Sequence, residues 1–188
     1  MPSAFDTERL RLRQWRASDR EPFAALHGDR RVMAFFPRTL PRPASDLLFD
    51  RLAAAMNARG WGFWAVEERA SGAFVGFAGL GVPPVALPFS PCVEIGWRLA
   101  SAYWGKGYAH EAARAALRVA FERLALPEVV AFTALPNQRS ERLMQRLGMT
   151  ADGVFEHPAL PVGHRLRPHK LYRLSRAAWL GQAVPERF

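Results

Sequence analysis

The stretch from Val93 to Leu117, VEIGWRLASAYWGKGYAHEAARAAL, is the most informative part of this 188-residue chain. It passes from a β-like segment through a glycine-bearing turn into an alanine-rich amphipathic helix. Gly105 and Gly107 allow backbone conformations closed to other residues and let a ligand approach without a Cβ in the way. The following helix N-terminus has unpaired amide protons, and Lys106 adds a full positive charge. The pattern predicts a site for a phosphorylated ligand, although such glycine pairs also occur in ordinary turns.

The residues Trp104 to Ala109, WGKGYA, resemble the pyrophosphate loop of the GCN5-related N-acetyltransferases. The usual loop has Gln or Arg, two residues, Gly, one residue, and Gly or Ala. Trp104 replaces the usual Gln or Arg, so the side-chain contact made there is not carried over, and backbone amides do most of the binding. The resemblance implies that acetyl-coenzyme A is bound by Trp104, Gly105, Lys106, Gly107, Tyr108 and Ala109.

Two further blocks support the same resemblance. Asn137–Ser140 and Leu143–Met149, NQRS and LMQRLGM, resemble the N-x-x-S helix and its exit in the branch of the ribosomal-protein-alanine acetyltransferases. Thr7–Arg13, TERLRLR, is similar to that branch's first strand. The blocks fall in the expected order and cover nearly the whole chain. The resemblance therefore implies one N-acetyltransferase domain over residues 1–188.

Hydrophobic periodicity predicts an order of elements that suits this fold. Leu10, Leu12 and Gln14 alternate with Arg9, Arg11 and Arg13, which is typical of a strand with one solvated face. Helices are expected at 19–27 with Ser18 as the cap, 30–36 as a short turn or two, 46–58 after a stiff Pro41–Pro43 connector, 109–124 and 139–147; further strands are expected at 63–67, 74–80, 93–99, 128–135, 150–156 and 170–174. This order predicts an α/β (α+β) fold, a mixed, mostly antiparallel sheet of about six or seven strands with helices on both faces.

The amino-acid composition indicates where the protein is located in the cell and which partners it binds. The chain is 49% hydrophobic and has no apolar run near the roughly 20 residues of a membrane-spanning helix, so we expect a cytoplasmic protein that does not bind membranes. The single cysteine, Cys92, cannot form an internal disulfide and is expected as a buried strand thiol. The formal charge of +9 comes mostly from dispersed arginines, so we expect no specific nucleic-acid binding. A coenzyme with several phosphates is a further reason for the basic balance.

The resemblance also implies how the rest of the coenzyme is held. Its pantetheine arm would run back along Val93–Leu99 and pair with backbone groups, as an extended ligand adds to an open strand edge. In the family this strand splays from its neighbour to admit the arm. Trp97, Arg98 and Leu99 are therefore expected to lie beside the coenzyme; the alternative is that they are ordinary strand residues.

Direct acetyl transfer needs a deprotonated amine and a proton source for the leaving thiolate. Glu94 lies near the place where some relatives have a carboxylate that accepts the amine's proton, and burial would raise its pKa usefully. The structural alternative is that Glu94 pairs with an arginine or holds a loop. Ser140 stands where the branch has a serine near the sulfur, or it is a capping hydroxyl. Asn137 is expected to contact the arm and cap the helix.

Three histidines bracket the segment HPALPVGHRLRPH, at positions 157, 164 and 169. Their spacing fits no compact zinc pattern, so we expect no metal. The segment lies where relatives shape the acceptor pocket, and His157 or His169 is an alternative base or a selector of substrate. Simple loop packing is the structural alternative.

The sequence thus predicts an acetyl-coenzyme-A-dependent N-acetyltransferase that works by direct transfer in a ternary complex. The acceptor amine, on a small molecule or a protein N-terminus, and the choice between monomer and homodimer stay open. A catalytically silent acyl-coenzyme-A-binding regulator is the alternative, and a basic nucleic-acid-binding module is a third reading.

Overall fold

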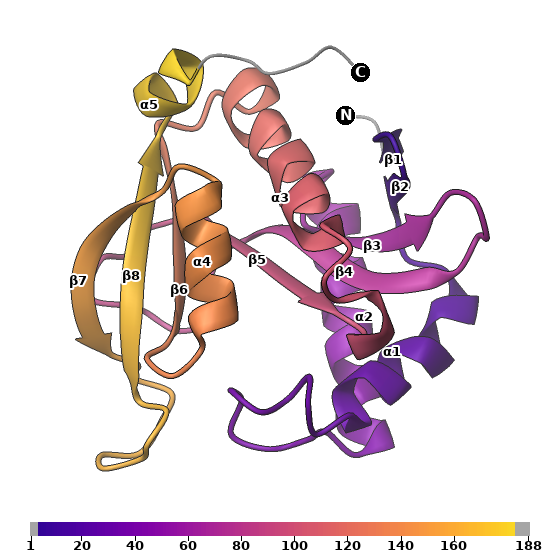
Figure 1. Cartoon of the computed structure of the whole chain (residues 1–188). Helices are drawn as coiled ribbons and strands as arrows, with labels where there is room; N and C mark the ends of the chain where they lie inside the picture. The colour runs from indigo at the N-terminus through magenta and orange to yellow at the C-terminus, as the bar shows by residue number, and fades with distance from the viewer. Residues whose placement is uncertain (1–3, 183–188) are drawn as a thin grey trace.

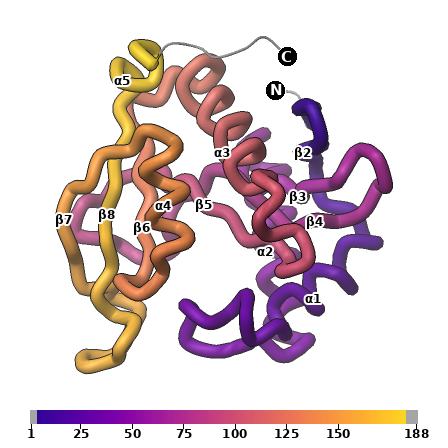
Figure 2. Tube along the Cα trace, in the orientation of Figure 1, coloured from indigo at the N-terminus to yellow at the C-terminus, as the bar shows by residue number. Residues whose placement is uncertain are grey.

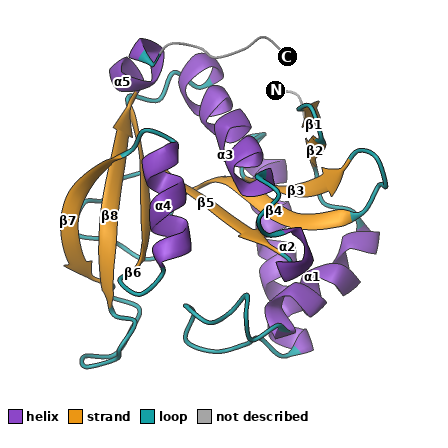
Figure 3. Ribbon diagram, in the orientation of Figure 1, coloured by secondary structure: helices purple, strands orange, loops and turns teal. Residues whose placement is uncertain are grey.

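The computed structural model describes residues 4–182 and contains one sheet of eight strands with helices on both faces (Figures 1 and 3). The strands are β1 (Ala4–Asp6), β2 (Leu10–Arg13), β3 (Phe63–Glu68), β4 (Phe74–Gly81), β5 (Glu94–Leu99), β6 (Glu128–Ala134), β7 (Thr150–Glu156) and β8 (Pro168–Ser175). Their spatial order is β1-β2-β3-β4-β5-β6-β8-β7, and within it only β5 and β6 pair in parallel. The predicted fold class is confirmed. The strand beyond the expected seven is β1, which has three residues.

The helices divide between the two faces of the sheet (Figure 3). They are α1 (Arg20–Gly28), α2 (Arg42–Arg59), α3 (Tyr108–Arg118), α4 (Gln138–Arg146) and α5 (Arg176–Gly181). Helices α3 and α4 lie on the face turned toward the viewer in Figure 1, and α1 and α2 lie on the other. The loop between α1 and α2 passes below the space between β5 and β6 (Figure 2). No helix within residues 4–182 is both long and apolar enough to cross a membrane.

The alanine stripe of α3 explains how closely that helix packs on the sheet. Ala112, Ala113, Ala116 and Leu117 have no exposed surface. Small side chains let helix and sheet approach closely, as the amphipathic pattern predicts. The helix expected to run to residue 124 ends at Arg118 and continues as a π-helical turn, Val119–Arg123.

The structure corrects four local predictions, and for the first two the local sequence gives the reason. Helix α2 begins at Arg42, so Pro43 lies in its first turn, where a missing N–H breaks no helical hydrogen bond. Ser18 is not a cap, because a 3₁₀ turn, Ala17–Asp19, precedes α1. Residues 30–36 form turns rather than a helix. Cys92 is half-buried in the loop before β5, not in a strand.

Arg13 corrects the expectation of a solvated arginine face on β2. Its residue surface is 4% exposed, and its guanidinium pairs with Asp19 and Glu67, each at 2.7 Å. The 3₁₀ turn returns the chain over β2 and places Asp19 against the strand. Two carboxylates therefore offset the cost of burying one guanidinium. The alternating pattern of a single strand cannot reveal this burial, because the two carboxylates come from other segments.

Candidate active site

An opening in the sheet lies between β5 and β6. The two strands pair at one position, Glu94 with Val130, where the Val130 N–H donates to the Val93 carbonyl oxygen at 3.0 Å. Beyond that pair the strands diverge (Figure 1). The opening belongs to a groove of about 1800 Å³ lined by residues from α2 on one face and α4 on the other. The splayed strand expected from the resemblance is present.

The glycine turn lies at the far end of β5 from Glu94, after a 3₁₀ turn, Ser101–Tyr103. Gly105 and Gly107 have φ angles of 77° and 82°, in the left-handed region that favours glycine. Gly107 is the N-cap of α3, and a Cβ on Gly105 would meet no atom within 4 Å. The turn therefore leaves backbone open beside a helix N-terminus, a geometry suited to an anion.

The N-terminal segment fixes this turn. The Arg9 guanidinium donates to the Lys106 carbonyl oxygen at 2.9 Å and to the Glu111 carboxylate at 2.7 Å. Thr7 Oγ1 donates to the same carboxylate at 2.6 Å. These partners are about a hundred positions apart in the chain, so sequence reasoning missed them and no local signal could have found them.

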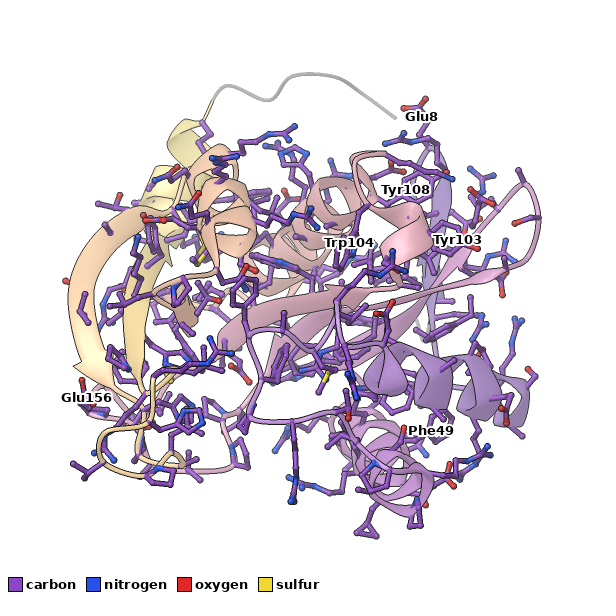
Figure 4. All side chains as sticks on the ribbon, turned by 60° about the horizontal axis from the view of Figure 1, so that its bottom comes forward. Glu8, Phe49, Tyr103, Trp104, Tyr108 and Glu156 are labelled. Carbon is purple, nitrogen blue, oxygen red and sulfur yellow. The ribbon has the colours of Figure 1, made fainter. Side chains whose placement is uncertain are left out.

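Aromatic side chains gather around the turn, where Figure 4 labels Tyr103, Trp104 and Tyr108. The Trp104 indole N–H donates to the Leu99 carbonyl oxygen at 2.9 Å. The Tyr108 hydroxyl points away to Glu68, to which it donates at 2.6 Å. Trp104, Gly105, Gly107, Tyr108 and Ala109 line the groove. The Lys106 side chain is not among the lining residues; its Nζ lies 5.1 Å from the centre of the Tyr103 ring.

Alternation along β5 separates its side chains between the two faces of the sheet. Glu94, Gly96 and Arg98 share one face, and the remaining strand residues, Trp97 and Leu99 among them, share the other. Arg98 lies opposite Phe77, whose ring packs on Phe23 of α1. The face of Glu94 and Arg98 is therefore the α1 side. The face with Trp97 and Leu99 is turned toward α3.

Glu94 stands at the closed end of the opening. Burial raises the pKa of its carboxyl to about 7. No hydrogen bond or ion pair from residues 4–182 reaches this carboxylate, so the alternative of a structural pair with an arginine finds no partner there. A carboxylate held half-charged near neutral pH can take up and release a proton.

Arg98 is the other charged group on this face of β5. Its guanidinium lies 3.7 Å from the centre of the Phe36 ring and 5.4 Å from that of Phe77. Its Nε is buried without a hydrogen-bond partner, and burial lowers the pKa of the guanidinium to about 9. Both Arg98 and Phe36 line the groove.

Asn137 and Ser140 lie together at the start of α4. Asn137 caps the helix as predicted, since its Oδ1 accepts the Ser140 N–H at 3.3 Å. Its amide Nδ2 donates to Ser140 Oγ at 3.1 Å and to Thr133 Oγ1 at 2.9 Å. Because Ser140 Oγ already accepts one hydrogen bond, its own proton is available to another acceptor. Both residues line the groove.

His157 and His169 face each other at the other side of the groove, with ring centres 4.8 Å apart. His169 Nδ1 donates to the Arg167 carbonyl oxygen at 3.0 Å, which leaves a lone pair on Nε2. His157 Nδ1 accepts the Ala159 N–H at 3.3 Å, so its proton is on Nε2. Burial lowers the pKa of both rings. Residues 4–182 contain no cluster of three or more His, Cys, Asp or Glu that could hold a metal.

Comparison with known proteins identifies the family of this chain. Residues 9–150 match the acetyltransferase (GNAT) domain family. This chain belongs to that family. A solved acetyltransferase of the GNAT family from Bacillus anthracis superposes with a TM-score of 0.77 at 24% identity, over 93% of this chain and 99% of the other. The predicted superfamily is therefore confirmed, and acetyl transfer from acetyl-coenzyme A is the chemistry that goes with it.

Two other similar proteins differ from each other in the acceptor that their names give. The FsC-acetyl coenzyme A-N(2)-transacetylase of Aspergillus fumigatus is 34% identical over 137 residues, which are 70% of this chain and 57% of that longer protein. A spermidine N-acetyltransferase from Vibrio cholerae, solved with CoA and spermine, has a TM-score of 0.73 at 19% identity, over 93% of this chain and 100% of the other. At that identity the likeness shows the fold alone.

Proposed function

We propose that this protein is an acetyl-coenzyme-A-dependent N-acetyltransferase that transfers the acetyl group directly to a primary amine in a ternary complex. The observation that carries the proposal is a half-buried carboxylate without a partner, Glu94, at the closed end of an opening whose far end is the glycine turn. The N-x-x-S block at Asn137–Ser140 supports the branch of the ribosomal-protein-alanine acetyltransferases.

The coenzyme half of the site would use backbone more than side chains. Amides of the turn at residues 104–109 would hold the pyrophosphate, and the unpaired edge of β5 beyond Glu94 would hold the arm. Trp97 and Leu99 would lie beside the arm. The Arg98 side chain points to the α1 side, so its contact with the coenzyme would be through its backbone. When bound, acetyl-coenzyme A supplies the acetyl group as a thioester.

The chemical step would be carried by two residues. Glu94, with a pKa of about 7, would accept a proton from the amine as it attacks. Ser140 would donate its hydroxyl proton toward the leaving sulfur, since Asn137 occupies its acceptor position. His169, with a lone pair on Nε2, is the alternative base, and His157 beside it is suited to a role in acceptor selection.

The competing readings predict different behaviour. A catalytically silent acyl-coenzyme-A regulator would bind the coenzyme and acetylate no amine. A basic nucleic-acid-binding module would bind nucleic acid with an affinity that falls steeply with salt and would ignore coenzyme A. The paired presence of Glu94 and Ser140 on the groove favours the enzyme. Small-molecule and protein acceptors, and monomer and homodimer, are all compatible with it.

Calorimetric titration with acetyl-coenzyme A at two salt concentrations tests the coenzyme site. Gly107→Glu should abolish binding, because it adds bulk and negative charge at the N-terminus of α3. Gly72→Glu is the matched control, since Gly72 also has a positive φ, 71°, and lies in the exposed turn between β3 and β4. Loss of binding in the first variant alone supports the site. Equal affinity in both variants would refute it.

A further inference from the structure

Arginines dominate the charged lining of the groove. Within residues 4–182 its lining contains one carboxylate, Glu94, and seven arginines: Arg31, Arg51, Arg59, Arg98, Arg139, Arg142 and Arg146. Among the seven, only Arg31 has a carboxylate partner in the described chain, Asp29 at 3.3 Å. The groove is therefore an uncompensated positive surface, which favours anions and repels polycations.

The coenzyme accounts for only part of this charge. Arg139, Arg142 and Arg146 belong to α4, on the same face as α3 and the glycine turn, where a phosphorylated ligand would lie. Arg51 and Arg59 belong to α2, and the Arg98 side chain points to the α1 side of the sheet. These three lie on the opposite face from α4, and the coenzyme phosphates do not explain them.

Arg98 is the most specific of the three. It is half-buried, its Nε has no partner, and its neighbours are the rings of Phe36 and Phe77. A guanidinium withdrawn from water without a carboxylate is costly, and stacking on rings offsets only part of that cost. Arg98 is one of the residues that line the groove, and no hydrogen bond of its terminal nitrogens occurs within residues 4–182. A planar carboxylate or a phosphate is the partner that fits such a donor group.

The position of Arg98 relative to Glu94 defines where that anion would lie. The two residues are four apart on one face of β5, so their Cα atoms are separated by roughly 13 Å at strand spacing. An amine at Glu94 could therefore belong to the same small molecule as an anion near Arg98. Phe36, from the loop between α1 and α2, would close over the segment between them.

We propose that the acceptor is a small amine that also carries an anionic group, a carboxylate or a phosphate, and that Arg98 binds this group while Arg51 and Arg59 attract it to the mouth of the groove. The inference rests on the proposed function and names the substrate class of the same site. It also distinguishes this protein from an acetyltransferase of polyamines, for which a groove with one carboxylate is unsuited.

Matched acceptor series test the proposal. The wild-type enzyme is assayed for acetyl transfer with ω-amino carboxylates, ω-aminoalkyl phosphates, n-alkylamines and α,ω-diamines of graded chain lengths. The readout is the ratio of kcat/KM for each anionic amine to that for the alkylamine of equal length, which cancels changes in coenzyme binding or in the active fraction. Arg98 is then replaced in Arg98→Met, which keeps the apolar packing, and in Arg98→Lys, which keeps the charge.

At one chain length the wild-type ratio should be about tenfold or more, as a charged hydrogen bond to a half-buried guanidinium implies. Arg98→Met should bring it close to one, Arg98→Lys should retain part of it, and the control Arg123→Met, which removes a charge from an exposed position outside the groove, should not change it. The better of the carboxylate and phosphate series identifies the anion.

Two results would overturn the inference and leave the proposed function intact: a preference for diamines, or a wild-type ratio that Arg98→Met does not alter. If Arg98→Met does not fold, the wild-type ratio and Arg98→Lys still decide between these outcomes. Absence of acetyl transfer to every amine, despite coenzyme binding, would instead overturn the proposed function.

Discussion

Replacing Glu94 with Gln should stabilise the protein at neutral and alkaline pH but not in acid. The Glu94 carboxyl has an ordinary pKa of 4.5, and burial raises it to about 7 in the folded protein. Between these values the unfolded chain loses the proton first, so stability falls as the pH rises and the loss is complete above pH 7. The difference between these two pKa values corresponds to roughly 3 kcal/mol of unfolding free energy.

Urea unfolding followed by circular dichroism at several pH values measures this effect. The difference in unfolding free energy between Glu94→Gln and wild type should grow from near zero at about pH 4 to roughly 3 kcal/mol at about pH 8. Glu8→Gln removes the same charge from an exposed position, which Figure 4 labels, and controls for net charge. A difference that is equal at both ends of the range would refute the burial argument.

In the same variant kcat should fall by roughly a hundredfold or more if Glu94 is the base.

Three further substitutions test other parts of the structure. Ser140→Ala should lower kcat by about tenfold or more while the KM for acetyl-coenzyme A changes little, and an unchanged kcat in steady-state kinetics would remove Ser140 from its role. If Glu94 is the base, kcat/KM should rise with pH around pH 7 as this carboxyl loses its proton, and His169→Gln should leave that rise in place. If the rise disappears in this variant, His169 rather than Glu94 is the base. Asp19→Asn should cost roughly 3 kcal/mol in urea unfolding, because the buried Arg13 loses a bidentate partner, and a loss well below 1 kcal/mol would contradict that.

The fold was predictable from the sequence because its long elements carry strong local patterns. The strand and glycine turn around Gly105, the alanine stripe of α3 and the Asn137 cap all occur as expected. Their cause is local, namely periodicity, glycine conformation and capping. Strand β1, with three residues, was not predicted because so short a segment has no period of its own.

The parts that escaped prediction depend on contacts between distant segments. Arg13 reads as solvent-facing until the 3₁₀ turn and β3 bring Asp19 and Glu67 against it. Likewise, the side chain of Arg98 lies near Phe77, whose ring packs on Phe23 of α1, and the sequence alone did not predict these contacts. The predicted contact of Arg98 with the coenzyme stays a prediction. The roles of the site residues, the cytoplasmic location and the single domain over 1–188 stay predictions.

The hydrogen bonds from Arg9 to Lys106 and Glu111 have a practical consequence for shortening the chain. A protein trimmed to begin after residue 9 would lose β1 but keep β2 to β8 and every groove residue. It would lose the only contact among residues 4–182 that holds the Lys106 carbonyl from outside its own helix and turn. Trimming there would therefore loosen the glycine turn, so the segment before β2 should be kept in any shortened version intended for ligand binding.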